Sequence, residues 1–162
     1  MSPDPESDPG LYWRAVAYNV LLQRCELRGS DQVLDLSPEE DIANVLREHV
    51  ASVRRASPAD RFLGQPSLVT AAFALSGLDL GARLSAFKRL HGAMPEGALL
   101  VMADWFWSIP FADIEGIEGW FDIARTPSAP ATQVMEELER SGWRVVLEPL
   151  HPAVSVLTAL RL

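Results

Sequence analysis

Covalent cross-links and metal ligands are scarce in this 162-residue sequence, in which Cys25 is the only cysteine. A single cysteine cannot form an internal disulfide, and no cysteine or histidine pair stands at metal-ligand spacing. The sequence therefore predicts neither a disulfide nor a metal site. This cysteine usage also favours a cytoplasmic location.

Long hydrophobic runs are absent as well. The longest, at residues 68–75 and 98–103, fall far short of the roughly 20 residues that a helix needs to span a bilayer. Residues 1–10 are acidic and rich in proline, and they lack the basic start and apolar stretch of a secretory signal. We expect no membrane partner, and we expect residues 1–10 to form a disordered tail before a single domain at residues 11–162.

Basic residues are few, because 14 Lys and Arg stand against 22 Asp and Glu, which gives a formal net charge of −8. An acidic balance argues against binding to the phosphate backbone of nucleic acids, so no nucleic-acid partner is expected. The hydrophobic share of 48% and the charged share of 22% are typical of a globular domain. They exclude a chain that is disordered or coiled-coil as a whole.

The hydrophobic residues recur alternately at helical and at strand spacing along the chain. Three residues together predict the start of a helix. Ser37 is the expected N-cap, Pro38 is the expected first helical residue, and Glu40 completes a capping box with Ser37. Asp79 is the predicted cap of a later helix, which Gly92 ends in the left-handed conformation. The predicted helices are residues 11–27, 37–50, 79–92 and 132–141, and the predicted strands are residues 32–36, 52–55, 67–75, 98–103, 143–147 and 153–161.

These elements predict an open α/β sheet. Strands separated by helices, as in the first two thirds of the chain, form parallel βαβ units. Only about five residues separate the last two strands, and a parallel crossover needs a dozen or more, so this pair must be antiparallel. The predicted fold is a mostly parallel, Rossmann-like sheet with helices on both faces and a C-terminal antiparallel strand pair.

Four segments of this pattern resemble class I S-adenosylmethionine-dependent methyltransferases. Residues 29–36 are similar to the first strand of that family, and residues 68–75 are similar to its fourth strand. Residues 95–101 are similar to its proline-glycine turn and fifth strand, and residues 136–143 are similar to its last helix and the start of its terminal hairpin. The resemblance implies S-adenosylmethionine as the cofactor and methyl transfer as the activity.

The sequence departs from that family around the cofactor site. Residues 36–41 stand where the family has a glycine-rich turn against the cofactor, yet they contain no glycine and three carboxylates. The family has at least two strands and two helices in the region that corresponds to residues 36–67. This segment is only about 30 residues long, which is the length that a single βαβ unit takes. One strand-helix unit is therefore expected to be missing. Residues 54–56 read Arg-Arg-Ala where the family has a ribose-binding acidic residue.

Polar residues follow the predicted strands at the edge where such folds bind ligands. The candidates for cofactor binding are Asp35, Ser37 and Ser76, and those for catalysis are Asp104 and His151. The two aspartates could also be capping or turn carboxylates, and the histidine could be a solvated turn residue. No metal-binding residues are predicted.

An aromatic stretch at residues 104–131 links the strand predicted at residues 98–103 to the next helix. Trp105, Trp107, Trp120 and Phe121 are candidates to line an apolar substrate pocket, because large aromatic side chains bury much apolar surface. The same residues could instead pack on the core or in a dimer interface, where aromatics are also enriched.

Two functions fit these observations. The first is a shortened, degenerate methyltransferase-like domain that does not bind S-adenosylmethionine normally, needs no cofactor, and acts as a partner subunit or binds a small apolar molecule. The alternative is an active S-adenosylmethionine-dependent small-molecule methyltransferase, or a related enzyme, with an altered cofactor loop. Because both faces of a parallel sheet need cover and one helix is missing, we expect a homo-oligomer or a complex with a heteromeric enzyme partner.

Overall fold

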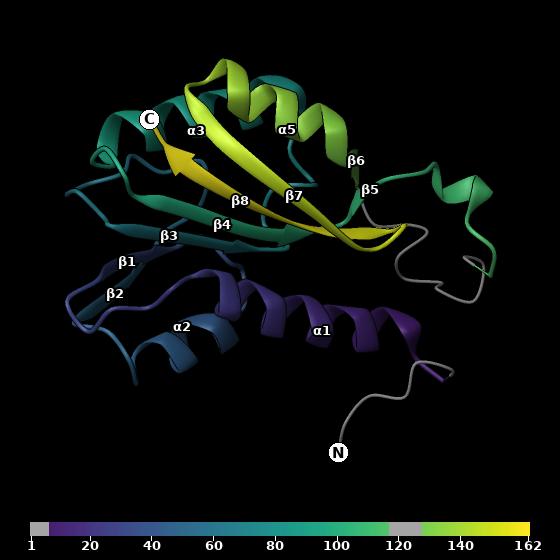
Figure 1. Cartoon of the computed structure of the whole chain (residues 1–162), viewed down its shortest axis with the longest axis horizontal. Coiled ribbons are helices and arrows are strands. Elements are labelled where there is room, and N and C mark those ends of the chain that lie inside the picture. The colour runs from purple at the N-terminus through teal and green to yellow at the C-terminus, as the bar shows by residue number, and fades with distance from the viewer. Residues whose placement is uncertain (1–6, 117–127) are drawn as a thin grey trace.

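A six-stranded sheet with strand order β2-β1-β3-β4-β8-β7 forms the centre of the computed structural model, which describes residues 7–116 and 128–162 (Figure 1). Its strands are β1 (Gln32–Asp35), β2 (Ser52–Arg55), β3 (Leu68–Ala72), β4 (Leu99–Asp104), β7 (Trp143–His151) and β8 (Val154–Arg161). The helices are α1 (Pro9–Arg24), α2 (Asp41–Leu46), α3 (Leu80–Ala93), α5 (Ala131–Arg140) and the short 3-10 helix η1 (Phe111–Asp113).

The strand directions confirm the predicted fold. Strands β1, β2, β3 and β4 pair in parallel, whereas β8 runs antiparallel to both β4 and β7. The β7–β8 hairpin contains a register shift between Pro149 and His151. Strand β7 extends to His151, beyond the predicted end at residue 147, whereas β8 begins one residue later than predicted. A second, two-stranded sheet of β5 (Phe106–Trp107) and β6 (Ala129–Pro130) was not predicted.

Two hydrophobic clusters separate the helices into layers on the two faces of the sheet (Figure 1). Neighbouring strand residues alternate between them: Leu34 belongs to the cluster under α3 and α5, and Val33 to the cluster under α1 and α2. This alternation is the period-two pattern of strands with apolar cover on both faces. The carboxyl ends of β1, β2, β3 and β4 consequently share one edge of the sheet.

The predicted loss of one strand-helix unit is also confirmed. Residues 56–67, between β2 and β3, form neither helix nor strand. Within the described part of the chain, β2 pairs only with β1 and is an edge strand of the sheet. The segment nevertheless places Ala56 and Phe62 against the hydrophobic cluster that lies under α3 and α5.

The predicted helix start at residue 37 is wrong. Helix α2 begins at Asp41, and its N-cap residue, Glu40, makes no capping hydrogen bond with its side chain. The Ser37 hydroxyl donates instead to the Asp35 carboxylate at 2.7 Å, while its oxygen accepts from the Ala72 backbone amide at 2.9 Å. A tertiary contact with β3 therefore outcompetes the local capping box.

Two other predicted helix ends differ from the structure. Gly92 lies inside α3, which ends at Ala93, and the C-cap residue Met94 is extended with φ −89° and ψ 142°. Helix α1 begins at Pro9, inside the predicted tail, because the Asp8 carboxylate accepts from the Leu11 amide at 3.1 Å and caps it. No helix among the described residues is long and apolar enough to cross a membrane.

Candidate functional site

A pocket of about 460 Å³ lies at the carboxyl edge of the parallel strands, where the sequence predicts a ligand site. Its wall consists of residues at or just after the ends of β1, β2 and β3, which are Leu36, Ser37, Pro38, Arg55, Ala56, Ser57, Pro58, Phe73 and Ala74. The pocket thus exists because three neighbouring strands end together and their loops diverge.

Asp35 and Ser37, two candidates for cofactor binding, lie together beneath this pocket. The Asp35 Oδ1 atom accepts from the Ser37 amide at 3.2 Å, from the Ser37 hydroxyl at 2.7 Å and from the Thr70 hydroxyl at 2.9 Å. The side chain of Asp35 is fully buried. These contacts join β1 to β3, so Oδ1 of Asp35 and the amide and hydroxyl of Ser37 are already engaged within the protein.

The second carboxylate oxygen of Asp35 is different. Oδ2 is buried and has no hydrogen-bond partner among the described residues, and the Arg55 Nε atom is 3.8 Å away. Burial raises the pKa of Asp35, although hydrogen bonds from Ser37 and Thr70 and the charge of Arg55 oppose the rise. The nearest cation to this unsatisfied oxygen is therefore Arg55.

Arg55 holds the loop that follows β1. Its Nη2 donates to the Ser37 carbonyl at 2.9 Å and to the Pro38 carbonyl at 3.1 Å, and its Nη1 lies 3.3 Å from a Glu40 carboxylate oxygen. It thereby places a guanidinium group in the pocket wall at the end of β2.

Asp104 and Ser76 also come together, as the predicted edge requires. The Asp104 carboxylate, which is buried, accepts from the amides of Leu75 at 2.8 Å, Ser76 at 3.0 Å and Trp105 at 2.8 Å. Burial raises the pKa of Asp104, and these hydrogen bonds oppose the rise. The carboxylate fixes the end of β4 against the turn that follows β3.

The aromatic candidates contribute unequally. Trp105 is buried, and its ring centroid lies 4.6 Å from that of Phe73. Trp107 is half-buried in β5, whereas Trp120 and Phe121 lie outside the described residues. Among the four, only Trp105 is shown to join an aromatic cluster at the pocket.

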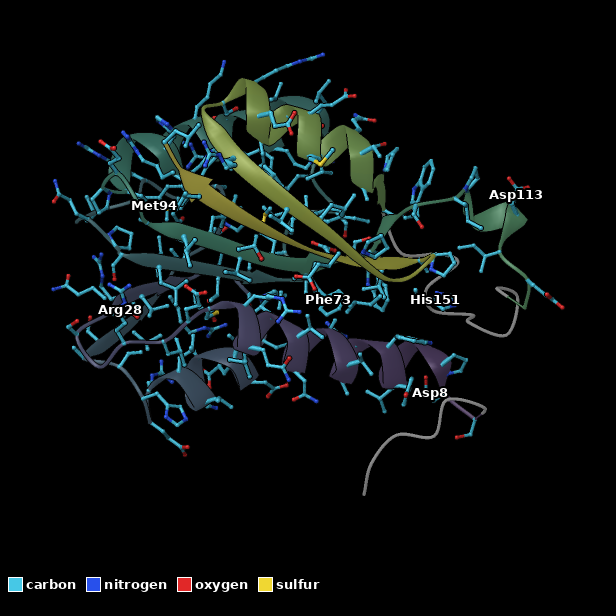
Figure 2. The ribbon with its side chains drawn as sticks, viewed as in Figure 1. Asp8, Arg28, Phe73, Met94, Asp113 and His151 are labelled. Carbon is cyan, nitrogen blue, oxygen red and sulfur yellow. The ribbon has the colours of Figure 1, made fainter. Side chains whose placement is uncertain are left out.

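Phe73 is a residue that the sequence analysis missed. It lies between α1 and the sheet (Figure 2), with the Tyr18 ring 5.7 Å and the Arg14 guanidinium carbon 4.8 Å from its centroid. Its φ of 57° is in the left-handed region, which is uncommon for an aromatic residue. A run of small apolar residues gave no signal for this conformation, and α1 was not expected to reach the site.

His151 lies apart from these groups, at the end of the β7–β8 hairpin (Figure 2). Its Nδ1 accepts from the Ala153 amide at 3.1 Å, and its ring centroid is 5.0 Å from that of Trp13. Burial lowers the pKa of His151. Within the described structure it does not line the 460 Å³ pocket.

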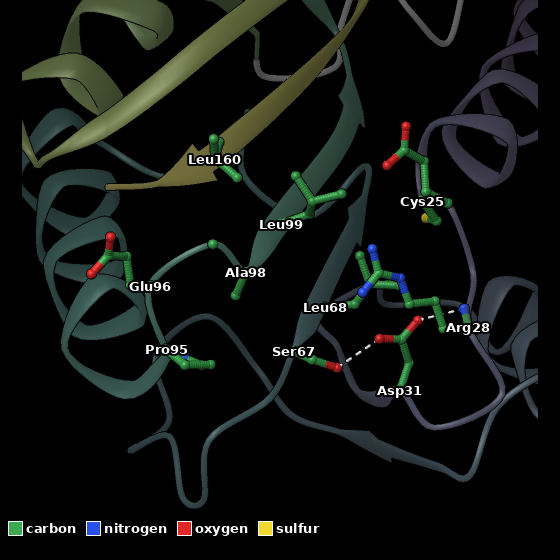
Figure 3. Close-up of a pocket in the computed structure, with 12 residues that line it drawn as sticks. Cys25, Arg28, Asp31, Ser67, Leu68, Pro95, Glu96, Ala98, Leu99 and Leu160 are labelled. Atoms are coloured by element: carbon green, nitrogen blue, oxygen red, sulfur yellow. Dashed lines mark hydrogen bonds between the residues drawn. The ribbon is translucent and has the colours of Figure 1, made fainter.

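A smaller cavity of about 270 Å³ lies at the opposite edge, where the strands begin (Figure 3). The Asp31 carboxylate accepts there from the Ser67 hydroxyl at 2.8 Å and from the Arg28 amide at 2.7 Å. Cys25 also lines this cavity, and burial raises the pKa of its thiol to about 12. The predicted polar candidates contribute nothing to this edge.

The fold is that of class I S-adenosylmethionine-dependent methyltransferases. No family model and no curated protein matches the sequence. Among solved structures, the pyocyanin biosynthetic protein PhzM is similar with a TM-score of 0.68 and 15% identity over 94% of this chain and 57% of its own. A Mesorhizobium loti S-adenosylmethionine-dependent methyltransferase is similar with a TM-score of 0.67 and 14% identity over 88% of this chain and 96% of its own.

Human N-acetylserotonin methyltransferase, in complex with S-adenosylmethionine, is similar with a TM-score of 0.62 and 11% identity, over 93% of this chain and 53% of its own. This chain therefore spans just over half the length of PhzM and of the human enzyme. Identities this low show the fold alone, so the chemistry of this chain depends on its own residues.

Proposed function

We propose that this methyltransferase-like chain does not bind S-adenosylmethionine in the usual pose and that its carboxyl-edge pocket binds a different small molecule. The observation that carries the proposal is the position of Arg55, whose guanidinium lies on the loop after β1 and forms part of the pocket wall. A guanidinium has five N–H donors and no acceptor, so it cannot accept hydrogen bonds from ribose hydroxyls as a carboxylate does.

The backbone of the loop after β1 supports the same proposal. The Leu36 amide donates to the Thr70 carbonyl at 2.8 Å, the Ser37 amide donates to Asp35, and Pro38 has no amide proton. Three successive positions of the loop therefore offer no free N–H to the carboxylate of the cofactor.

Charge weakens cofactor binding further. S-adenosylmethionine carries a sulfonium cation, which a guanidinium repels, whereas its carboxylate would approach the loop that contains Glu39 and Glu40. The sulfonium and the carboxylate of the cofactor would thus each meet a group of like charge. These effects act together with the absence of glycine in residues 36–41, because side chains occupy space that a glycine turn leaves open.

An active methyltransferase is the second candidate. The pocket of about 460 Å³ at the carboxyl edge favours it, because methyl transfer relies largely on positioning the donor and the nucleophile. On this alternative Arg55 would have to leave the carbonyl groups of Ser37 and Pro38 when the cofactor enters.

Isothermal titration calorimetry with S-adenosylmethionine and S-adenosylhomocysteine separates the two candidates. The proposal predicts no binding by either compound to folded protein, and it predicts that Arg55→Asp raises the affinity by restoring a carboxylate at the end of β2. Arg140→Asp, which makes the same change on the exposed end of α5, should not raise it. Micromolar binding by the unchanged protein would overturn the proposal and favour the enzyme.

A further inference from the structure

Positive charge is concentrated around the carboxyl end of β2, although the chain has a formal net charge of −8. The 460 Å³ pocket adjoins a cavity of about 400 Å³, and the two share Arg55 and Ala56. Arg54, Arg55 and Arg61 line one or both of these cavities, which together we call the arginine groove, and Asp60 is the only carboxylate among the described residues that line them.

Two arginines at the groove, Arg54 and the neighbouring Arg89, donate to neutral carbonyl groups. The Arg54 Nη2 atom donates to the Leu63 carbonyl, and Arg89, behind the same loop, donates to the carbonyls of Pro58 and Asp60. A carbonyl oxygen orients a guanidinium without cancelling its charge. In the described part of the chain, Arg61 is exposed and has no hydrogen bond or ion pair.

The carboxylates near the groove compensate only part of this charge. Glu40, whose side chain is 66% exposed, lies 3.3 Å from Arg55, and the buried Asp35 lies 3.8 Å from it. The Asp60 carboxylate accepts from the Ser57 amide at 2.8 Å, so it faces the turn of its own loop. An anion entering the groove would therefore compete with Glu40 and Asp35 for Arg55, whereas Arg61 has no ion pair among the described residues and is open to it.

Apolar side chains form much of the rest of the groove, beside Ser37 and Ser57. Leu36, Pro38 and Phe73 line the larger cavity, and Phe62 lines the smaller one. Phe73 is half-buried and is packed against Trp105, so its position is fixed before any ligand binds. A flat or apolar group can pack on these side chains while an attached anion reaches the arginines.

We infer that the arginine groove binds a small molecule that joins an apolar ring to a phosphate or carboxylate group. The inference rests on the proposed function, because it specifies the ligand class of the same pocket. A guanidinium group suits both anions, because a phosphate or a carboxylate can each accept two parallel hydrogen bonds from it.

Naphthyl phosphate and naphthol form a matched pair of probes, because they differ only in the anionic group. By calorimetry or fluorescence at low salt, we expect the phosphate ester to bind at least about tenfold more tightly, a factor that corresponds to one charge-assisted hydrogen bond. Raising the ionic strength from about 0.01 M to about 1 M should weaken the ester, because the Debye length falls from about 30 Å to about 3 Å. Naphthoate in place of the ester distinguishes a carboxylate from a phosphate ligand.

Arginine variants identify the groups responsible. Arg61→Gln should weaken the ester about tenfold and leave naphthol unchanged, since Arg61 has no contacts whose loss would unfold the protein. Arg55→Gln should weaken the ester at least as much, after circular dichroism has shown that the variant folds. Arg140→Gln removes the same charge from the exposed end of α5 and should change neither affinity.

Three results would overturn the inference: binding of neither probe, equal affinities for the two probes, or equal effects of Arg61→Gln and Arg140→Gln. These results are distinct from a failure of the proposed function. Micromolar binding of S-adenosylmethionine would overturn the proposed function, whether or not naphthyl phosphate binds. If neither naphthyl phosphate nor naphthol binds, only the inferred ligand class is overturned.

Discussion

Asp104 connects the end of β4 to the turn after β3 through three hydrogen bonds from backbone amides. An asparagine has one acceptor oxygen in place of two, and its amide group would face a backbone donor. Asp104→Asn should therefore lower the free energy of unfolding by about 1–3 kcal/mol, as expected when buried donors lose their partner.

Urea denaturation at neutral pH measures this change. The exposed Asp113 in η1 provides the control, because Asp113→Asn makes the same chemical change outside the core and should alter stability little. Equal stability of Asp104→Asn and the unchanged protein would show that these hydrogen bonds contribute nothing.

His151 should make stability depend on pH. Burial lowers its pKa in the folded chain, whereas an unfolded histidine titrates near pH 6.5. Its contribution is therefore complete above about pH 6.5 and is lost as the pH falls through that value toward the folded pKa, because the unfolded chain then binds more protons.

His151→Gln should accordingly lose less stability than the unchanged protein when the pH is lowered from about 7.5 to about 5. Denaturation curves at several pH values give the slope. A parallel slope for His151→Gln would contradict the account of this residue.

At the scale of elements, a buried ion pair joins α3 to α5. The Arg83 Nε and Nη2 atoms each lie 2.9 Å from a carboxylate oxygen of Glu137, and both side chains are at least 95% buried. Removing one partner leaves the other charge buried without a counter-charge. Arg83→Met and Glu137→Leu should therefore each lower the free energy of unfolding by about 3–5 kcal/mol.

The double variant Arg83→Met with Glu137→Leu should recover most of that loss, because no unpaired charge remains in the core. A chemical denaturation cycle of the four proteins gives the coupling energy. Strictly additive losses would mean that the two side chains act independently despite their contact.

The order of the elements could be predicted because it depends on local patterns. Buried strands such as β3 and β4 are continuous apolar runs, and the short connection before β8 allows only an antiparallel neighbour. The short segment between β1 and β3 likewise leaves no room for another strand-helix unit, which the structure confirms.

Details that depend on distant residues were not predictable in the same way. Ser37 carries every local sign of a helix cap, yet its hydroxyl bonds to Asp35 and to the amide of Ala72 on another strand. The strained backbone of Phe73 and the approach of Arg14 from α1 depend on packing across the sheet. The sequence therefore predicts which strand ends form the pocket. The roles of the individual pocket residues depend on tertiary contacts, which the sequence pattern does not reveal.

At the scale of the whole molecule, we propose that the protein forms a homo-oligomer or binds a heteromeric enzyme partner. The outer edge of β2 has no strand partner in the described structure, and Leu63 beside it is 62% exposed. Multi-angle light scattering of the purified protein should give more than the mass of one chain, or a second protein should co-purify. A monodisperse monomer with no partner would contradict this proposal.

The central claim concerns the occupant of the carboxyl-edge pocket, and a nuclear magnetic resonance competition tests it most directly. Naphthyl phosphate should shift the backbone amide signals of Ala56 and Ala74, which line the pocket, and excess S-adenosylmethionine should not reverse those shifts. The signal of Glu96, at the opposite edge, reports nonspecific effects and should not move. If S-adenosylmethionine alone shifts Ala56 and Ala74, or displaces the phosphate ester from them, the pocket is a cofactor site and the account is wrong.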